Sequence, residues 1–405
     1  MIFLYILLAI AVFGVLIFVH ELGHFLAARA CNVTVHEFSI GMGPKVVSFC
    51  PGKKRAEREK RQKEADRAVY ENEFSVDPRP PKPIGQTAEE KDDSAEKASG
   101  PVYTTYSIRA LPLGGFVSME GENEESDDPN AFHKKSAPKR MLILVAGAAM
   151  NLILGFILMF ILVCSTNFTT TAVFYPREGP YAQESYLSEE SGLRDMDKIL
   201  KIGKTRVHTG YEVSYEIMYQ GYEPIDITVK RDGETIVLQD IVFPTLEEGG
   251  ATVGLQDFGF YAYSRETVTL WDRISATFWR CNSTVKMVWD SLGGLFSGRF
   301  GVESISGPVG VTEVIVDAAQ QSRVQLLYIV TVITINLGIM NLLPLPALDG
   351  GQLLICVIET VIRRPISERV KGLINFAGLA ILMLLMAVIA VKDVSGLLSR
   401  LFGGR

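Results

Sequence analysis

The sequence predicts a polytopic α-helical membrane protein with four transmembrane helices and soluble regions between them. The first observation is that four stretches contain no Asp, Glu, Lys or Arg, namely residues 2–19, 141–164, 324–348 and 372–391. Each is close to the roughly 20 residues that cross the hydrocarbon core of a bilayer. The second is that the 40 Lys and Arg and the 46 Asp and Glu of the 405-residue chain all fall outside these stretches. This partition excludes a soluble cytosolic enzyme, a disordered chain and a secreted disulfide scaffold.

The charge balance and the cysteines exclude further classes of protein. The formal net charge is −6 and no segment forms a concentrated basic surface, so the sequence indicates no nucleic-acid partner. The five cysteines are scattered and never occur as C-x-x-C, so neither a disulfide framework nor a thiolate zinc site is indicated.

Residues 1–31 are predicted to form a retained transmembrane helix. A cleaved signal peptide would open with basic residues and end at a small-x-small site, and this segment has neither feature in clear form. We therefore expect the first helix to be retained in the mature protein.

Residues 32–140 form the first polar region. The segments 35–49 and 103–119 are β-prone and rich in glycine, so we expect them to pair with each other. Between them lies a charged insert, residues 51–100, with 12 basic and 12 acidic residues and a proline-rich run. Such a segment cannot bury a core, and we interpret it as solvated. The sharper alternative is that its basic part, residues 53–67, touches anionic lipid.

The second polar region follows the helix at 141–164 and divides in two. Residues 170–250 are expected to form a small β-rich domain, with a strand at 199–202 and a hairpin whose turn is Asp232-Gly233. Residues 251–323 are interpreted as an amphipathic linker, helical over 266–297. Its three tryptophans favour a helix lying in the membrane interface, and packing on the β domain is the equally weighted alternative.

Basic residues beside the spans predict the orientation, because short cytoplasmic loops carry excess Lys and Arg. They place region 32–140 and the loop between the last two spans in the cytoplasm, and region 165–323 and both termini outside. The residues concerned are Lys134, Lys135, Lys139, Arg140, Arg363, Arg364, Arg369 and Lys371.

The most informative motif is His20-Glu21-Leu22-Gly23-His24, at the end of the first span. Residues i and i+4 of a helix share a face, so both imidazoles can reach one Zn²⁺, and Glu21 can take a proton from the attacking water. Ionisable groups on a membrane span are costly and usually functional. The alternative is an interfacial His/Glu cluster without a metal.

A third zinc ligand is expected because catalytic zinc sites generally have three from protein. The best candidate is Asp349, in the segment 324–351 that forms the third span and ends in N-x-x-P-x-P-x-L-D-G-G. Two prolines end the helix there, and Gly350 and Gly351 are expected to give the backbone freedom. The first and third spans run in the same direction, so both motifs reach the same face. The alternative is a simple helix-terminating aspartate.

Two amides inside the third span, Asn336 and Asn341, need partners in an apolar environment. Either could hydrogen-bond substrate or a developing oxyanion, and interhelical packing is the competing interpretation. Gly147, Asn151 and Gly155 form a stripe on the second span that is typical of close helix packing. The three remaining histidines, His36, His133 and His208, are interpreted as surface or structural residues.

The combination of an intramembrane HExxH, the downstream N-x-x-P-x-P-x-L-D-G-G and a β domain between spans two and three resembles the site-2 protease family. It is most similar to bacterial metalloproteases of regulated intramembrane proteolysis that carry a PDZ domain. The segments 38–45, 109–117 and 307–310 also resemble family segments. The resemblance covers nearly the whole chain except 51–100.

The resemblance implies a role for each motif residue. His20, His24 and Asp349 would bind Zn²⁺, Glu21 would be the general base, and Asn336 and Asn341 would hold substrate or stabilise the oxyanion. The paired segments would form a membrane-associated β hairpin. Its edge would capture an unwound substrate as an added strand. The edge residues are Leu113, Gly114, Gly115 and Phe116.

The same resemblance implies an extracytoplasmic PDZ-like α+β domain at 170–250 and a location in the bacterial plasma membrane. The expected substrates are single-pass membrane proteins such as an anti-sigma factor or a signal-peptide remnant, cut after an upstream protease has made a first cut. One departure is Met196, which stands where the domain's turn usually has glycine. It leaves the binding of peptide carboxylates by this domain open.

Two other classes of function compete with proteolysis. A non-proteolytic membrane scaffold that binds partners through the PDZ-like domain predicts a degenerate metal site, which this sequence does not have. A zinc transporter would need further acidic or histidine residues within its spans.

Overall fold

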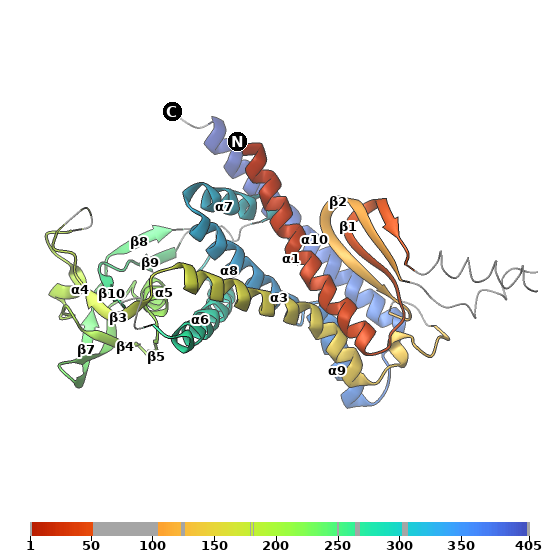
Figure 1. The fold of residues 1–405 in the computed structure, drawn as a ribbon, viewed down its shortest axis with the longest axis horizontal. Helices are drawn as coiled ribbons and strands as arrows, with labels where there is room; N and C mark the ends of the chain where they lie inside the picture. The colour runs from red at the N-terminus through yellow and green to blue at the C-terminus, as the bar shows by residue number, and fades with distance from the viewer. Residues whose placement is uncertain are drawn as a thin grey trace, which may run out of the picture. The chain divides into compact units, whose positions relative to one another are not determined.

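The computed structural model describes residues 2–51, 104–122, 126–178, 180, 182–248, 251–263, 268–301 and 307–402. The charged insert, apart from its first residue, lies outside this described part. The fold consists of two compact units (Figure 1). Phe13–Ala146 form the first unit, and Met1–Val12 together with Gly147–Arg405 form the second.

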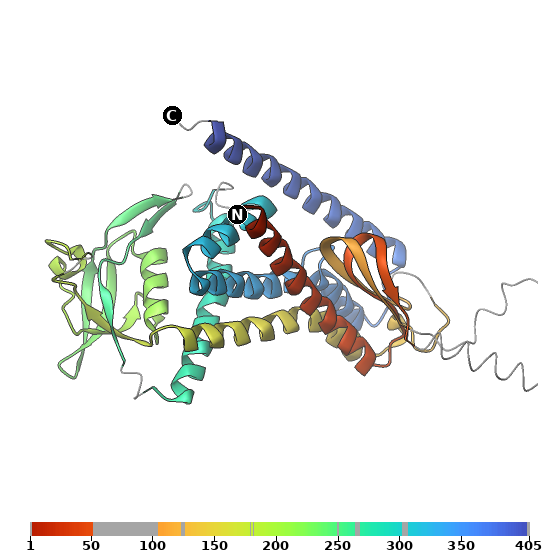
Figure 2. The ribbon, with the colours of Figure 1, turned by 45° about the horizontal axis from the view of Figure 1, so that its top comes forward.

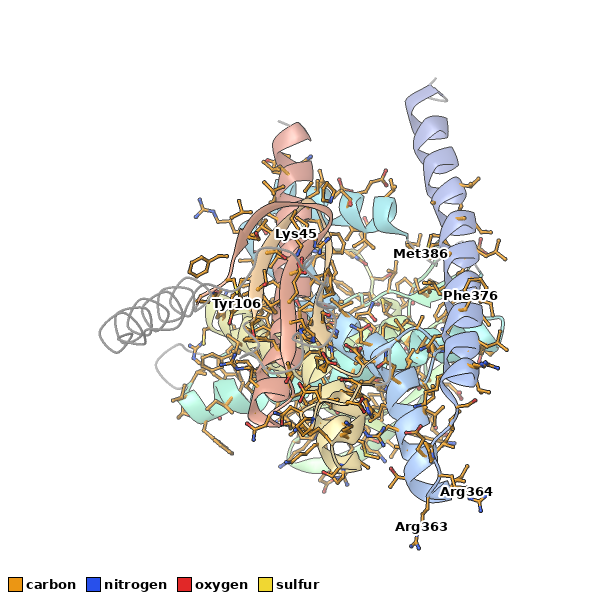
Figure 3. All side chains as sticks on the ribbon, turned by 90° about the vertical axis from the view of Figure 1, so that its right-hand side faces the viewer. Lys45, Tyr106, Arg363, Arg364, Phe376 and Met386 are labelled. Carbon is orange, nitrogen blue, oxygen red and sulfur yellow. The ribbon has the colours of Figure 1, made fainter. Side chains whose placement is uncertain are left out.

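Four helices of the described residues are long and apolar enough to cross a membrane, as the sequence predicts. They are α1 (Ile2–Ala30), α3 (Ala137–Ser165), α8 (Arg323–Leu342) and α10 (Glu368–Phe402). Helix α8 ends six residues before the end of the uncharged stretch, because Pro344 and Pro346 cannot continue it. On α10, exposed Phe376 and Met386 are apolar side chains of the kind that face lipid (Figure 3).

The first unit contains the predicted pair of β segments, β1 (Val35–Phe49) and β2 (Thr105–Met119), which are antiparallel partners. Both strands bend, at Gly41, Gly43 and Gly114, whose φ angles are positive. As a result residues 37–40 of β1 pair with 115–118 on one side and with 105–108 on the other. Two strands thus make a sheet of four short stretches, with 115–119 at one edge.

Aromatic contacts hold this hairpin against α1. The ring of Phe38 lies 5.8 Å from that of Phe18 and 5.2 Å from that of Phe25, and Tyr106 lies 5.9 Å from Phe25. Lys45 and Tyr106 mark the two strands in Figure 3. The hairpin is therefore fixed to the helix that carries the HExxH motif.

The β domain of the second unit, residues 169–262, is built on one antiparallel sheet in the order β10-β3-β4-β6-β7, with β5 beside β4. Two further strands, β8 and β9, pair with each other in a separate two-stranded sheet. The strands are β3 (Thr169–Phe174), β4 (Lys198–Ile202), β5 (Thr205–Arg206), β6 (Ile225–Arg231), β7 (Glu234–Ile241), β8 (Thr245–Glu248), β9 (Ala251–Gly254) and β10 (Gly259–Ala262). The helices are α4 (Leu187–Glu190) and α5 (Gly210–Gln220).

The predicted strand at 199–202 and the predicted hairpin are present in this domain. Asp232 and Gly233 both have positive φ, as a two-residue turn of this kind requires. The sheet extends past residue 250, because β10 pairs with β3. Val173, Ile199, Ile227 and Ile241 are fully buried in its core.

Met196 occupies a left-handed position, with φ of 68°, and its side chain is 64% exposed. A side chain at such a position costs about 1 kcal/mol relative to glycine. We expect Met196→Gly to raise the free energy of unfolding of the β domain by about that amount. Amide hydrogen exchange on the full chain measures it.

The matched control is Met218→Gly, which places glycine at an exposed position of α5 with helical geometry. It should lower the same free energy by about 1 kcal/mol. Equal effects of the two substitutions would contradict the interpretation of Met196 as strained.

Helix α6 (Leu270–Phe296) packs on both the β domain and the membrane helices. Its Lys286 pairs with Glu216 of α5 at 2.9 Å, and Tyr215 donates to Asp290 at 2.8 Å. Its Val288 lies in one apolar cluster with Ile335 of α8. Packing on the β domain is therefore confirmed, while Leu270, Trp271 and Trp289 remain exposed.

Close packing between α3 and α8 is also confirmed. A Cβ added at Gly155 would collide with the side chain of Ile335, and Asn151 is fully buried. Figure 2 shows α6 crossing both helices. The remaining helices of the described part are the short η2 (Phe132–Lys134), α7 (Pro308–Gln321) and α9 (Asp349–Ile362).

Candidate metal centre

Helix α1 places the two motif histidines side by side. His20 and His24 are 9% and 8% exposed, and their Nε2 atoms lie 3.1 Å apart. The i, i+4 spacing on an unbroken helix puts both rings on one face. The structure thus brings together the two ligands that the motif predicts.

A backbone carbonyl of α3 sets the tautomer of His24. Nδ1 of His24 lies 2.8 Å from the carbonyl oxygen of Ile143, and since a carbonyl can only accept, Nδ1 carries the proton. The Nε2 lone pair of His24 then points toward His20. Two buried imidazole nitrogens that converge in this way fit a metal ion. A hydrogen bond from the other ring nitrogen to a backbone carbonyl, as His24 makes with Ile143, orients a histidine ligand. No sequence pattern could have identified the Ile143 carbonyl, because any residue can supply a backbone carbonyl.

Glu21 lies against the hairpin. A Cβ added at Gly115 of β2 would sit 3.0 Å from Cγ of Glu21 and 2.9 Å from the carbonyl oxygen of Ser39. Glycine is therefore the residue that lets β2 approach the motif glutamate so closely. The sequence assigns Gly115 to substrate capture and does not predict its contact with Glu21. The Gly114-Gly115 doublet was the sequence feature that could have indicated such a close approach.

We expect Gly115→Ala to lower the rate of peptide cleavage about tenfold, because the added methyl displaces Glu21 or β2 by some tenths of an ångström. Cleavage of a single-span reporter by purified enzyme measures it. The control is Gly14→Ala on α1, where a Cβ meets nothing within 4 Å. Full activity of Gly115→Ala would show that the close approach does not matter.

Charged side chains stiffen the bends of the hairpin. Glu37 accepts hydrogen bonds from Ser107, from Lys45 at 2.8 Å and from Arg109 at 3.0 Å, and Arg109 also donates to the carbonyl of Gly43 at 2.7 Å. Partial burial raises the pKa of Glu37, but these donors outweigh it and bring the pKa below its ordinary value. The carboxylate is therefore ionised at neutral pH and joins the stretches of the sheet.

Asp349 is the first residue of α9, in the second unit. The loop before it folds back, so that a Cβ at Gly350 or Gly351 would collide with the carbonyl of Leu343 or Leu345. Neither glycine has positive φ, so close approach rather than conformational freedom requires them; the left-handed residue of the loop is Ala347, with φ of 72°. A carboxylate at the first residue of a helix lies near the positive end of the helix dipole.

The two asparagines of α8 do not share a face. Asn336 is exposed and Asn341 is half-buried near the end of the helix. Five residues correspond to a rotation of about 140° between them. Joint action of both amides on one substrate stays a prediction.

The other histidines have structural partners, in line with their interpretation. His36 pairs with Glu120, His133 contacts the carbonyl of Gly121 at 3.1 Å, and His208 stacks on Trp279. Among the described residues outside the motif, no histidine joins a group that could hold a metal ion.

Comparison with known proteins identifies relatives along the whole chain. The family model of Peptidase family M50 matches residues 8–57 and 99–385, and the gap between these two ranges, residues 58–98, lies within the charged insert. A chain of Clostridium acetobutylicum, provisionally named a zinc metalloprotease, is 31% identical, with 97% of this chain and 98% of the relative aligned. The zinc metalloprotease RasP of Shouchella clausii is 28% identical over 96% and 98% of the two chains. The regulator of sigma-W protease RasP of Bacillus subtilis is 27% identical over 96% and 97%.

Proposed function

Because the chain belongs to peptidase family M50 and is an intramembrane zinc metalloendopeptidase, we propose that it cleaves transmembrane segments of single-pass membrane proteins. The substrate is an anti-sigma factor or a signal-peptide remnant that an upstream protease has already shortened. One relative is named as a regulator of a sigma factor, which supports the first of these classes.

One observation carries this proposal. Two buried histidines with converging nitrogens, and a glutamate between them, lie on a helix that is long and apolar enough to cross a membrane. Ionisable groups in such a place are costly and usually functional. A peptidase site there acts on peptide bonds at membrane depth.

We propose that His20, His24 and Asp349 hold the Zn²⁺. Each offers one ligand atom, an imidazole nitrogen from either histidine and a carboxylate oxygen from Asp349. The sequence supports this set, because the N-x-x-P-x-P-x-L-D-G-G motif that contains Asp349 occurs in the same chain as the HExxH motif that contains both histidines.

Bound Zn²⁺ supplies Lewis acidity toward the scissile carbonyl and its attacking water. Glu21 accepts the proton of the attacking water and returns it to the leaving amine. Asn341, or Asn336 from the other face of α8, donates from its amide to the substrate backbone or the developing oxyanion. The protein's own residues thus provide the proton transfer and the orientation.

The free edge of the hairpin is proposed to hold the substrate in an extended form. A helical peptide hides its carbonyls, so cleavage needs local unwinding, and strand addition stabilises the unwound form. In the described part of the sheet, residues 115–119 pair on one side only. Leu113, Gly114, Gly115 and Phe116 would form this edge, next to Glu21.

The orientation proposed for the membrane follows the basic residues. Region 32–140 and the loop that carries Arg363 and Arg364 would lie in the cytoplasm. Both arginines are exposed on that loop (Figure 3). The β domain and both termini lie outside the bacterial plasma membrane. The β domain is PDZ-like and acts as a size filter or docking site. The alternative function, a scaffold that binds partners without cutting them, predicts no dependence on zinc.

The proposal is tested by cleavage of a single-span reporter with purified enzyme in lipid nanodiscs. Removing zinc with a permeant chelator should abolish cleavage within the span, and added Zn²⁺ should restore it. A reporter whose span lacks helix-destabilising residues serves as the control. Binding of the reporter without any zinc-dependent cut would favour the scaffold instead.

A further inference from the structure

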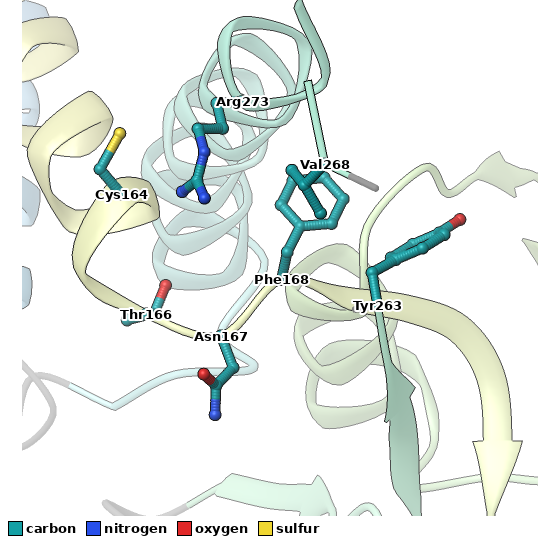
Figure 4. Close-up of a pocket in the computed structure, with 7 residues that line it drawn as sticks. All are labelled: Cys164, Thr166, Asn167, Phe168, Tyr263, Val268 and Arg273. Atoms are coloured by element: carbon teal, nitrogen blue, oxygen red, sulfur yellow. The ribbon is translucent and has the colours of Figure 1, made fainter. Parts of the chain in front are cut away.

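A cavity of about 150 Å³ lies where α3 ends and α6 begins, apart from the proposed metal centre. Cys164 and Thr166 border it from the end of α3, and Phe168 and Tyr263 from the two ends of the β domain (Figure 4). Arg273 enters it from α6. Its volume corresponds to about five water molecules, which is enough for a phosphate group.

Arg273 brings a positive charge into this cavity. Figure 4 shows its guanidinium directed from α6 toward Thr166. It donates one hydrogen bond, from Nη1 to the carbonyl of Val163 at 3.4 Å. No carboxylate of the described residues pairs with it, and the described residues that line the cavity include no acidic side chain. A guanidinium has five donors, so several stay available for an anion.

The walls of the cavity are held in place by the β domain. The amide of Tyr263 donates to the carbonyl of Phe168 at 2.8 Å, and their rings lie 5.5 Å apart. The cavity is therefore part of the folded domain junction and does not depend on a single side chain.

Its position suits the headgroup layer of a membrane. Helix α3, a candidate span, ends at Ser165, next to the cavity. At the start of α6, Leu270 is 64% and Trp271 is 74% exposed. Exposed tryptophan beside the end of a span is typical of the membrane–water interface.

We propose that this cavity binds the phosphate group of an anionic phospholipid, with Arg273 as its main ligand. Arginine binds phosphate through paired charge-assisted hydrogen bonds. The described lining residues offer no carboxylate for a choline or ethanolamine cation, so a headgroup such as glycerol, which lacks a cation, fits better. The acyl chains would run along Leu270 and Trp271. The competing role of Arg273, capping the last carbonyls of α3, uses one donor and leaves the others for the lipid.

The test measures lipid retained by the full chain. Wild-type protein is reconstituted in nanodiscs of phosphatidylcholine with phosphatidylglycerol, extracted in mild detergent and examined by native mass spectrometry. Arg273→Gln should lower phosphatidylglycerol retention about fivefold, the equivalent of about 1 kcal/mol for one arginine at an anionic surface. Arg273→Lys should retain most of it. The matched control, Arg194→Gln, removes an exposed arginine of the β domain and should retain all of it.

A second variant separates lipid binding from helix capping. Cys164→Phe fills the cavity and leaves the contact of Arg273 with Val163 in place, so it should also lose the lipid. Unchanged retention in Cys164→Phe or in Arg273→Gln would overturn the proposal.

Inorganic phosphate is the second probe, added to wild type in nanodiscs of phosphatidylcholine alone. If it protects the chain against heat as well as phosphatidylglycerol does, the site takes free phosphate and the lipid assignment is wrong.

Discussion

Glu21→Gln is expected to lower the rate of reporter cleavage by about 10³-fold, because loss of a general base typically costs 10²- to 10⁴-fold. Glutamine has nearly the same shape as glutamate, so it fits beside Gly115 without displacing β2. What it lacks is the carboxylate that accepts a proton from the attacking water. The measurement is single-turnover cleavage of the reporter in nanodiscs, with the zinc content of each preparation determined alongside.

The zinc content of Glu21→Gln should equal that of wild type, because Glu21 is not a proposed ligand. Glu223→Gln, which neutralises an exposed carboxylate of the β domain, is the matched control and should cleave normally. Equal cleavage by Glu21→Gln and wild type would refute the proposed mechanism. Loss of zinc in Glu21→Gln would instead make Glu21 a ligand.

Asp349→Asn is expected to lower zinc affinity by at least about 100-fold, since losing even an outer partner of a zinc ligand costs 10- to 100-fold. Asparagine replaces the carboxylate with a neutral group of the same shape and is also accepted at the start of a helix. The substitution therefore separates a metal ligand from a residue that merely begins α9. Zinc per chain after dialysis, and cleavage at rising zinc concentrations, provide the two readouts.

Asp317→Asn on α7 is the control, because Asp317 is an exposed aspartate that is not a proposed ligand. It should bind zinc and cleave as wild type does. If Asp349→Asn keeps both its zinc and its activity, the third ligand must be sought elsewhere. Partial recovery of cleavage at high zinc would be the expected signature of a weakened site.

The pairing of the two hairpin strands could be predicted from the sequence, but the bent shape of the hairpin could not. The β-prone segments around the charged insert were correctly predicted to pair, because alternation and glycine content are properties of short segments. Their doubling into four stretches was not predictable, since it depends on positive φ at Gly41, Gly43 and Gly114 and on contacts with α1. Within this region, the family model leaves residues 58–98 of the charged insert unmatched.

For the loop before Asp349, the Gly350-Gly351 pair was identified from the sequence but explained incorrectly. The two glycines were expected to give the backbone freedom, whereas they are needed because carbonyls of Leu343 and Leu345 approach them. The left-handed position lies instead at Ala347. Steric crowding of this kind arises only once the loop has folded back on α9.

The sequence by itself determined the four spans, the paired histidines and the family, because hydropathy and i, i+4 spacing are local properties of the chain. The tertiary structure decided which contacts set the tautomer of His24 and the position of Glu21. The carbonyl that sets the tautomer of His24 is 119 residues away in the sequence. Gly115, whose lack of a side chain leaves space for Glu21 of α1, lies on strand β2. Contacts at such separations depend on how helices and strands pack, and packing is a property of the folded chain as a whole.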